Sequence, residues 1–310
     1  MRSLDADILR TVLYADVFDF PLTAREIHHF LIADRSCTSI EVKRALAEPA
    51  LDAQIAQVDD CVTLRGREWL VPLRANRQAA ADALWREAVH YGAWLSRLPF
   101  VRMVAVTGAL AMRNPSDERD DIDYVLVIVP GRVWLARLLA IAVVRIARLR
   151  GVTLCPNYVL SESALAQNRR DLFIAHEVTQ MVPLYGCAVY HAMRASNAWV
   201  AHHLPNADGA FVRAAELRTR GLWGWVKRAG EALLGGRIGD TIEAWEYRRK
   251  QARFARQIKA TSAARIDSDN VKGHFNDHGV RVLARYAESA RAWGLDREQS
   301  EGARLPLAGD

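Results

Sequence analysis

The chain has 310 residues, of which 51% are apolar and 25% charged, so it can bury a sizeable core without disulfides or structural metals. Its scattered cysteines form no CxxC pair, which argues against a zinc ribbon or disulfide scaffold, and its first residues lack the apolar stretch of a signal peptide, so we expect a cytoplasmic protein. The net charge of +6 is unevenly distributed: residues 1–72 carry −4 and residues 73–310 carry +10, of which residues 211–260 contribute +7. An acidic partner is therefore expected to bind beyond residue 72.

The first segment reads as helical. Residues 5–18 place apolar side chains at helical spacing. Thr23 and Thr38 are each followed three residues later by Glu, the pattern of a capping box. In such a box the hydroxyl and the carboxylate satisfy backbone N–H groups reciprocally, so we expect two further helices to begin at these threonines.

The pattern then changes to strands. Residues 58–64 and 67–71 alternate as strands would and flank Arg65-Gly66, which predicts a tight hairpin turn. Three helices followed by a hairpin resemble a winged helix, so residues 1–72 are predicted to form a winged-helix-like domain.

DNA binding is one function that a winged helix suggests, because its third helix commonly enters the major groove. Here the charged residues of that helix sum to −1 and the whole domain is acidic. Such a surface is poorly suited to phosphate contacts. We therefore expect no nucleic acid on this domain, and favour a packing or protein-contact role.

The next elements frame a candidate site. An Ala-rich helix is predicted over residues 76–98, followed by an apolar strand over 100–107 and then Gly108. A charged loop leads to a second apolar strand over residues 121–129, which begins Asp-Ile-Asp.

Asp121 and Asp123 fall on the same face of that strand because side chains alternate with a period of two. Two adjacent carboxylates repel each other unless a cation or protons relieve them. Mg²⁺ suits them, since it takes oxygen ligands and shares them with phosphates. Such a pair at a strand start is often only a solvated turn, but Gly108 at the end of the preceding strand would permit close backbone approach to a phosphate.

The segment VAVTGALAMRNPSDERDDIDYVLVIV resembles the signature of the nucleotidyltransferase (DNA polymerase β-like) superfamily, and most of the chain is similar to bacterial proteins that contain such a domain. In that signature a Gly-Ser or Gly-Gly pair precedes a carboxylate-x-carboxylate strand. Gly108 and Ala109 match the pair, and Asp121 and Asp123 match the metal ligands. The resemblance implies an α+β nucleotidyltransferase fold, a small mixed sheet with helices, over residues 73–205.

Two positions depart from the family pattern. Ala109 stands where the family has Ser or Gly, so a hydroxyl contact to the phosphates is lost. Many members carry a third carboxylate on a neighbouring strand, but the strand predicted over residues 153–160 offers Asn157, which can bind a ligand yet cannot act as a general base. Glu162, just beyond that strand, is the alternative carboxylate.

The resemblance implies a Mg²⁺-dependent enzyme that moves a nucleoside monophosphate from an NTP to a small-molecule or macromolecular acceptor, with release of pyrophosphate. Asp121 and Asp123 would hold the Mg²⁺ that bridges the phosphates. Two alternatives stay open: a weakly active or inactive relative that binds a nucleotide or partner, and a winged-helix regulator that binds DNA.

A helical region is predicted over residues 206–298. The longest apolar run, residues 133–146, is interrupted by Arg137 and indicates a buried amphipathic helix, not a membrane span. A helix over residues 171–181 leaves His176 and Glu177 outside its predicted buried stripe, and His176 is interpreted as structural. A basic helix over residues 222–234 is expected to bury its tryptophans and solvate its cations.

The segment 267–279 gathers charged residues and histidines around two glycines and is expected to form a loop before a helix. Lys272 and His278 are its candidate nucleotide contacts, since a lysine ammonium can meet a phosphate. Residues 299–310 are polar with Gly and Pro, and we expect a disordered tail.

Overall fold

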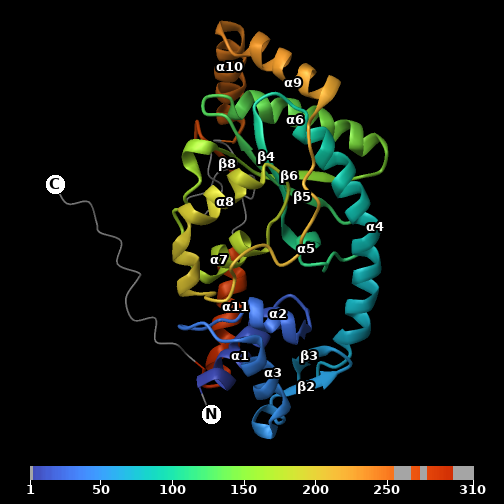
Figure 1. The fold of residues 1–310 in the computed structure, drawn as a ribbon, viewed down its shortest axis with the longest axis vertical. Coiled ribbons are helices and arrows are strands. Elements are labelled where there is room, and N and C mark those ends of the chain that lie inside the picture. Colours follow the sequence, from blue (N-terminus) through green and yellow to red (C-terminus); the bar gives the residue numbers. More distant parts are fainter. Residues whose placement is uncertain (1–2, 255–266, 273–277, 296–310) are drawn as a thin grey trace, which may run out of the picture.

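The computed structural model describes residues 3–254, 267–272 and 278–295, and its fold is α+β, as predicted. A small helical unit with its own three-stranded sheet lies at one end, and a five-stranded sheet covered by helices lies beyond it (Figure 1). No helix in the described ranges has both the length and the apolar character that crossing a bilayer requires.

The N-terminal unit follows the predicted order of helices and a hairpin. Its elements are α1 (Ser3–Asp16), β1 (Leu22–Thr23), α2 (Ala24–His29), α3 (Ser39–Ala47), a 3-10 turn (Pro49–Leu51), β2 (Ile55–Val58) and β3 (Cys61–Leu64). Both predicted capping boxes are present: Thr23 caps α2 and Thr38 caps α3, each with the Glu three residues on. Its strands pair antiparallel in the order β1-β3-β2.

The hairpin lies earlier than predicted. Val58 pairs with Cys61, so the chain turns at Asp59-Asp60, in the middle of the predicted strand 58–64. Asp59 has φ +52°, a left-handed conformation that aspartate tolerates better than most residues, and this makes the two-residue turn possible. The predicted second strand, residues 67–71, runs into α4 (Leu70–Ser96) instead.

The central sheet is mixed, with the order β7-β4-β5-β6-β8. Its strands are β4 (Val101–Val106), β5 (Ile122–Ile128), β6 (Leu154–Ser161), β7 (Val182–Tyr185) and β8 (Asn270–Lys272). Among the described strands of this sheet, β5 and β6 pair parallel and the other neighbours pair antiparallel. The parallel pair is joined across one face of the sheet by α6 (Val133–Leu149), which is the predicted amphipathic helix.

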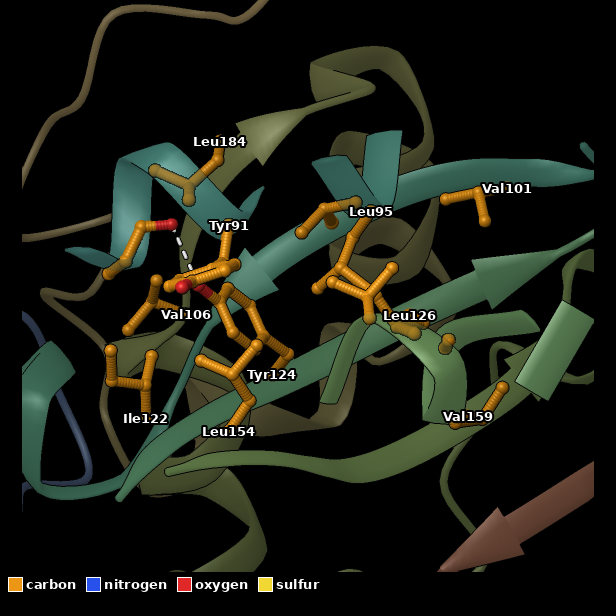
Figure 2. Packing of buried hydrophobic residues seen from close by; sticks show 14 of the residues in the cluster. Tyr91, Leu95, Val101, Val106, Ile122, Tyr124, Leu126, Leu154, Val159 and Leu184 are labelled. Atoms are coloured by element: carbon orange, nitrogen blue, oxygen red, sulfur yellow. Dashed lines mark hydrogen bonds between the residues drawn. The ribbon is translucent and has the colours of Figure 1, made fainter. Parts of the chain in front are cut away.

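One face of the sheet packs against α4 and α6. Alternate residues of β4 and β5, among them Val106, Tyr124 and Leu126, point into this cluster (Figure 2). The Tyr124 hydroxyl donates a 2.7 Å hydrogen bond to the Ala88 carbonyl, which satisfies the one polar atom of that side chain in the core (Figure 2).

The opposite face packs against helices from the middle and the end of the chain. These are α7 (Leu172–Gln180), α8 (Cys187–Ser196) and α11 (His278–Ala292), with 3-10 turns at Glu162–Ala164 and Ala198–His202. The short helix α5 (Gly108–Ala111) follows β4 and buries Leu110 and Ala111 in the cluster of the first face. Tyr14 and Ile32 of the N-terminal unit belong to the same apolar cluster as Met103 and Val125 of the sheet. The two units therefore share a core.

Polar contacts also join the two units. The Arg74 guanidinium of α4 makes two hydrogen bonds, 2.8 and 2.9 Å long, to the Glu26 carboxylate of α2. Asn114, in the loop before β5, donates to the Phe18 carbonyl at 3.1 Å and accepts from Arg77 at 3.0 Å. Bidentate and charge-assisted hydrogen bonds of this kind fix orientation, so the N-terminal unit is held in one position on the sheet.

The C-terminal region returns to both units. After α9 (Gly221–Leu234) and α10 (Arg237–Phe254), β8 pairs with β6 as an edge strand of the sheet, and α11 packs between α1 and α7 (Figure 1). The strand β8 replaces part of the loop expected over residues 267–279. The predicted tail at 299–310 lies outside the described residues, and the domain boundaries at 72, 205 and 298 stay predictions.

The expectation for the helix over residues 222–234 was wrong. In α9, Trp223 and Trp225 are 48% and 63% exposed, whereas Lys227 is only 6% exposed. The Lys227 ammonium donates to the carbonyls of Ser96 and Val101 at 2.8 and 2.6 Å. These carbonyls lie at the end of α4 and the start of β4, and the buried cation supplies donors that no apolar side chain could offer.

Candidate metal and nucleotide site

The predicted carboxylate pair lies at the beginning of β5. Tyr124 points into the core shared with α4 and α6, so Asp123 points to the opposite face together with Val125. Asp121 shares that face, as predicted: ligand atoms of Asp121, Asp123 and Cys155 all lie within 4.8 Å of one another. Cys155 comes from β6, where it pairs directly with Asp123.

Because Gly108 has no side chain, the Asp123 carboxylate can lie directly against its backbone. Gly108 has φ +67°, and a Cβ atom at this position would lie 2.5 Å from Asp123 Oδ2. The backbone N–H of Thr107 donates to the Asp123 carbonyl at 3.0 Å, which brings the two segments together. The sequence predicted that this glycine allows close approach, but the group that approaches it is the carboxylate.

Three buried oxygen atoms beside the pair lack hydrogen-bond partners among the described residues. They are Thr107 Oγ1, Asp123 Oδ1 and Asn157 Oδ1, and all three residues line one cavity. Leaving such an atom unsatisfied costs about 1–3 kcal/mol. Three of them together indicate a site built to receive a cation or a polar ligand.

Electrostatics favour a hard cation. Burial, together with the negative charge of Asp121, raises the pKa of Asp123 to about 7. Burial and the neighbouring Asp123 also raise the pKa of the Cys155 thiol well above its usual range. A protonated thiol is a weak metal ligand, whereas two carboxylates and an amide are oxygen donors. The donor set therefore fits Mg²⁺ better than Zn²⁺.

The structure brings most of the predicted site residues to the same cavity, which has a volume of about 340 Å³. Besides Asp123, its lining includes Gly108, Ala109, Asn157 and His278. Asp121 is not among the described lining residues, but its carboxylate lies beside that of Asp123.

Two other predicted residues lie differently. Lys272 is on β8, where its backbone pairs with Tyr158 of β6, next to Asn157. Its side chain lies outside the described residues. Glu162, the alternative third carboxylate, begins the turn after β6 and is not among the described residues that line the cavity.

Several lining residues were missed or misplaced by the sequence. Glu177 of α7 contributes a carboxylate to the cavity wall, and Tyr14 and Phe30 contribute aromatic rings from the N-terminal unit. His176 is buried, although the sequence placed it outside the buried stripe of its helix. Burial lowers the pKa of His176 to about 3. The helical pattern of residues 171–181 gave no sign of this burial, because the rings that cover His176 come from elsewhere in the chain.

Comparison with known proteins gave no relatives: no family model, no curated protein and no solved structure matches this chain. Similarity therefore shows no family for it. What the site does has to be inferred from its residues, their geometry and their charge.

Proposed function

We propose that the protein is a Mg²⁺-dependent nucleotidyltransferase that moves a nucleoside monophosphate from an NTP to an acceptor and releases pyrophosphate. The observation that carries the proposal is the cluster of Asp121 and Asp123 against Gly108, where Asp123 and Gly108 line a cavity. The order of strand, glycine, loop and Asp-x-Asp strand is also the order of the signature that the sequence resembles.

The residues present fit the ion. Asp121 and Asp123 would hold Mg²⁺. Asn157 Oδ1, which has no hydrogen-bond partner in the described part of the chain, is a further oxygen on the same cavity. Bound Mg²⁺ supplies charge neutralisation to the phosphates of the nucleotide. Gly108 leaves room for the Asp123 carboxylate at this position, because the side chain of any larger residue would displace that carboxylate.

The transfer forms a bond from an acceptor oxygen to the α-phosphorus and breaks the bond from that phosphorus to the pyrophosphate leaving group. The acceptor must also lose a proton. Asn157 cannot accept it. We assign this proton to Glu177, since it is a carboxylate on the cavity wall outside the cluster formed by Asp121, Asp123 and Cys155.

Calorimetric titration of each of the four NTPs, with and without Mg²⁺, tests the proposal. One NTP should bind the wild type only with Mg²⁺, and Asp123→Asn should weaken that binding about a hundredfold or more, because it removes a direct ligand. Glu118→Gln is the matched control: it removes one charge from an exposed residue of the preceding loop and should bind like the wild type. Metal-independent binding, or equal binding by both variants, would refute the metal role of Asp123.

A second candidate is a protein that binds the nucleotide without transferring it. Ala109 and Asn157 favour it, because each lacks a group that the family signature supplies. Pyrophosphate release separates the two. Release from Mg²⁺ and the bound NTP in the presence of an acceptor supports transfer, and its absence across a broad acceptor set supports binding alone.

We further infer that residues 3–64 form a winged-helix unit with a structural role. Its support is the element order of α1, β1, α2, α3 and the β2–β3 hairpin. The packing role is supported by Tyr14 and Ile32, which are buried in the core shared with the sheet. A DNA-binding role would instead require duplex DNA to bind the full-length protein with a steep salt dependence.

A further inference from the structure

The cavity extends well beyond the aspartate pair. Asp123 and Gly108 line it together with residues of α7, α11 and the N-terminal unit. Most of its lining side chains away from the pair are aromatic or aliphatic. Small-molecule sites have this composition: an apolar body and a few polar groups that fix orientation.

Aromatic rings form a continuous row along one wall. The Tyr14 ring stacks on the His176 ring with a centroid distance of 4.1 Å and an interplanar angle of 11°. Phe30 lies 5.8 Å from His176, and Phe18 lies 5.6 Å from Tyr14. Three of these rings come from the N-terminal unit and one from α7, so neither unit forms this wall alone.

The aromatic wall offers a hydrogen bond but no charge. His176 Nε2 is buried and has no hydrogen-bond partner among the described residues. Because the pKa of this histidine is lowered to about 3 by burial, the ring is neutral at physiological pH. A ligand that lies along the wall can therefore satisfy His176 Nε2, and apart from this nitrogen and the Tyr14 hydroxyl the four rings present apolar surface to the ligand.

The charged groups of the cavity exclude an anion from this part. Asp123 and Glu177 are acidic, and the Arg169 guanidinium is paired with Asp171. His278, at the start of α11, is the remaining titratable lining residue besides His176 and Tyr14 and Tyr158. No lysine is among the described lining residues. The aromatic wall therefore has no cluster of cations that could bind a triphosphate, and we place the triphosphate beside Asp123, where Mg²⁺ would bind.

A nucleobase also fits the aromatic wall poorly. Its edge carries several hydrogen-bonding atoms, and burying them without partners costs about 1–3 kcal/mol each. Against these, the wall offers His176 Nε2 as its buried side-chain atom without a partner in the described residues. Since neither the triphosphate nor the nucleobase suits the aromatic wall, we assign this part of the cavity to the acceptor.

The cavity wall is also preorganised. Asn114 ties the Phe18 carbonyl to the loop before β5, and Arg74 binds Glu26 with two hydrogen bonds. The aromatic rings therefore keep their positions without a ligand, which lowers the entropic cost of binding one.

From these observations we infer that the N-terminal unit and α7 together form the acceptor site, and that the acceptor is an uncharged hydroxyl compound with an aromatic or cyclic apolar body. The inference rests on the proposed function for the reaction. There the acceptor hydroxyl oxygen would bond to the α-phosphorus, pyrophosphate would leave, and Glu177 would take the hydroxyl proton. The binding of the apolar body needs only the cavity.

The test uses 2-naphthol as the probe, with 2-naphthoate as its charged analogue and glycerol as a hydroxyl compound without an apolar body. Each is titrated by calorimetry into the full-length protein. We expect 2-naphthol to bind, 2-naphthoate to bind at least about tenfold more weakly because of Asp123 and Glu177, and glycerol not to bind.

Two variants locate the binding. Phe18→Ala removes a half-buried ring from the cavity and should weaken 2-naphthol binding about tenfold while Mg²⁺·NTP binding is kept. Phe211→Ala is the control, because Phe211 is similarly half-buried and its ring lies 5.5 Å from that of Phe30, but it is not among the described residues that line this cavity. It should bind 2-naphthol like the wild type.

Three results would overturn the inference. They are no binding of 2-naphthol, an equal loss of 2-naphthol affinity in Phe18→Ala and Phe211→Ala, and competition between 2-naphthol and Mg²⁺·NTP. Competition would mean that the nucleobase binds at the aromatic wall. Failure of the proposed function has a separate signature. In that case Asp123→Asn would leave NTP binding unchanged. The affinity of Phe18→Ala for 2-naphthol would still show whether an apolar ligand binds at the aromatic wall.

Discussion

His176 makes the stability of the protein depend on pH in a way that can be calculated. Its pKa is lowered by burial from 6.5 to about 3. Between these values the unfolded chain binds a proton that the folded protein does not, so stability is highest above pH 6.5 and falls as the pH drops. At pH 5, which is 1.5 pH units below 6.5, the loss is about 2 kcal/mol at about 1.4 kcal/mol per unit.

Replacing His176 with Phe should remove this loss. A phenyl ring keeps the stack with Tyr14 and Phe30 and has nothing to protonate. Urea unfolding at pH 7, 6 and 5 gives the free energy of unfolding for each protein. Between pH 7 and pH 5 the wild type should lose about 2 kcal/mol more than His176→Phe.

His90 provides the control, because it is exposed on α4. His90→Gln should show the pH dependence of the wild type. His29 also has a pKa lowered by burial, to about 4, so part of the pH dependence stays in His176→Phe. Identical slopes for wild type and His176→Phe would refute the reasoning, since they would mean that His176 takes up its proton in the folded state at an ordinary pH.

Three further outcomes are expected. Gly108→Ala should lower the free energy of unfolding by about 1–2 kcal/mol because of its left-handed backbone, and should also weaken Mg²⁺·NTP binding, measured by calorimetry, because the new Cβ displaces Asp123. Gly131→Ala should show the loss of stability alone, because Gly131 has φ +71° and no described residue other than its chain neighbours lies within 4 Å of the new Cβ. Glu243→Ala should lower stability in urea by about 1–2 kcal/mol, since its carboxylate caps the first N–H groups of α6; no change would refute the cap. Glu177→Gln should slow pyrophosphate release at unchanged Mg²⁺·NTP affinity, and full activity would remove its role as proton acceptor.

Local patterns predicted the local features well. The spacing of Asp121 and Asp123 was enough to place both on one face, because strand geometry repeats every two residues. Capping boxes at Thr23 and Thr38 likewise depend on residues only three positions apart. The mixed sheet, by contrast, was expected only because the segment around Asp121 and Asp123 resembles a known family signature.

Features set by distant residues could not be predicted in this way. The hairpin was misplaced because Arg65-Gly66 is the stronger turn signal, although Asp59 can also adopt a left-handed conformation. The strand β8 has three residues, too few for any periodicity, and it exists because β6 leaves an edge to pair with.

The same limit applies to the candidate site. The aromatic wall exists because Tyr14 meets His176, which lies far along the chain. Nothing in either local segment signals that meeting. Lys227 is buried for a similar reason, since its partners Ser96 and Val101 belong to other elements.

The position of α11 has a consequence for how the protein is made. Ala290 and Leu295, at the end of the described chain, belong to the same buried cluster as Ile8 and Leu13 of α1. During synthesis α1 leaves the ribosome long before α11, so the apolar surface of α1 that α11 covers stays exposed until α11 has been made. Long-range contacts of this kind slow folding. The cavity, with His278 in its wall, is therefore completed only after nearly all of the described residues have been translated.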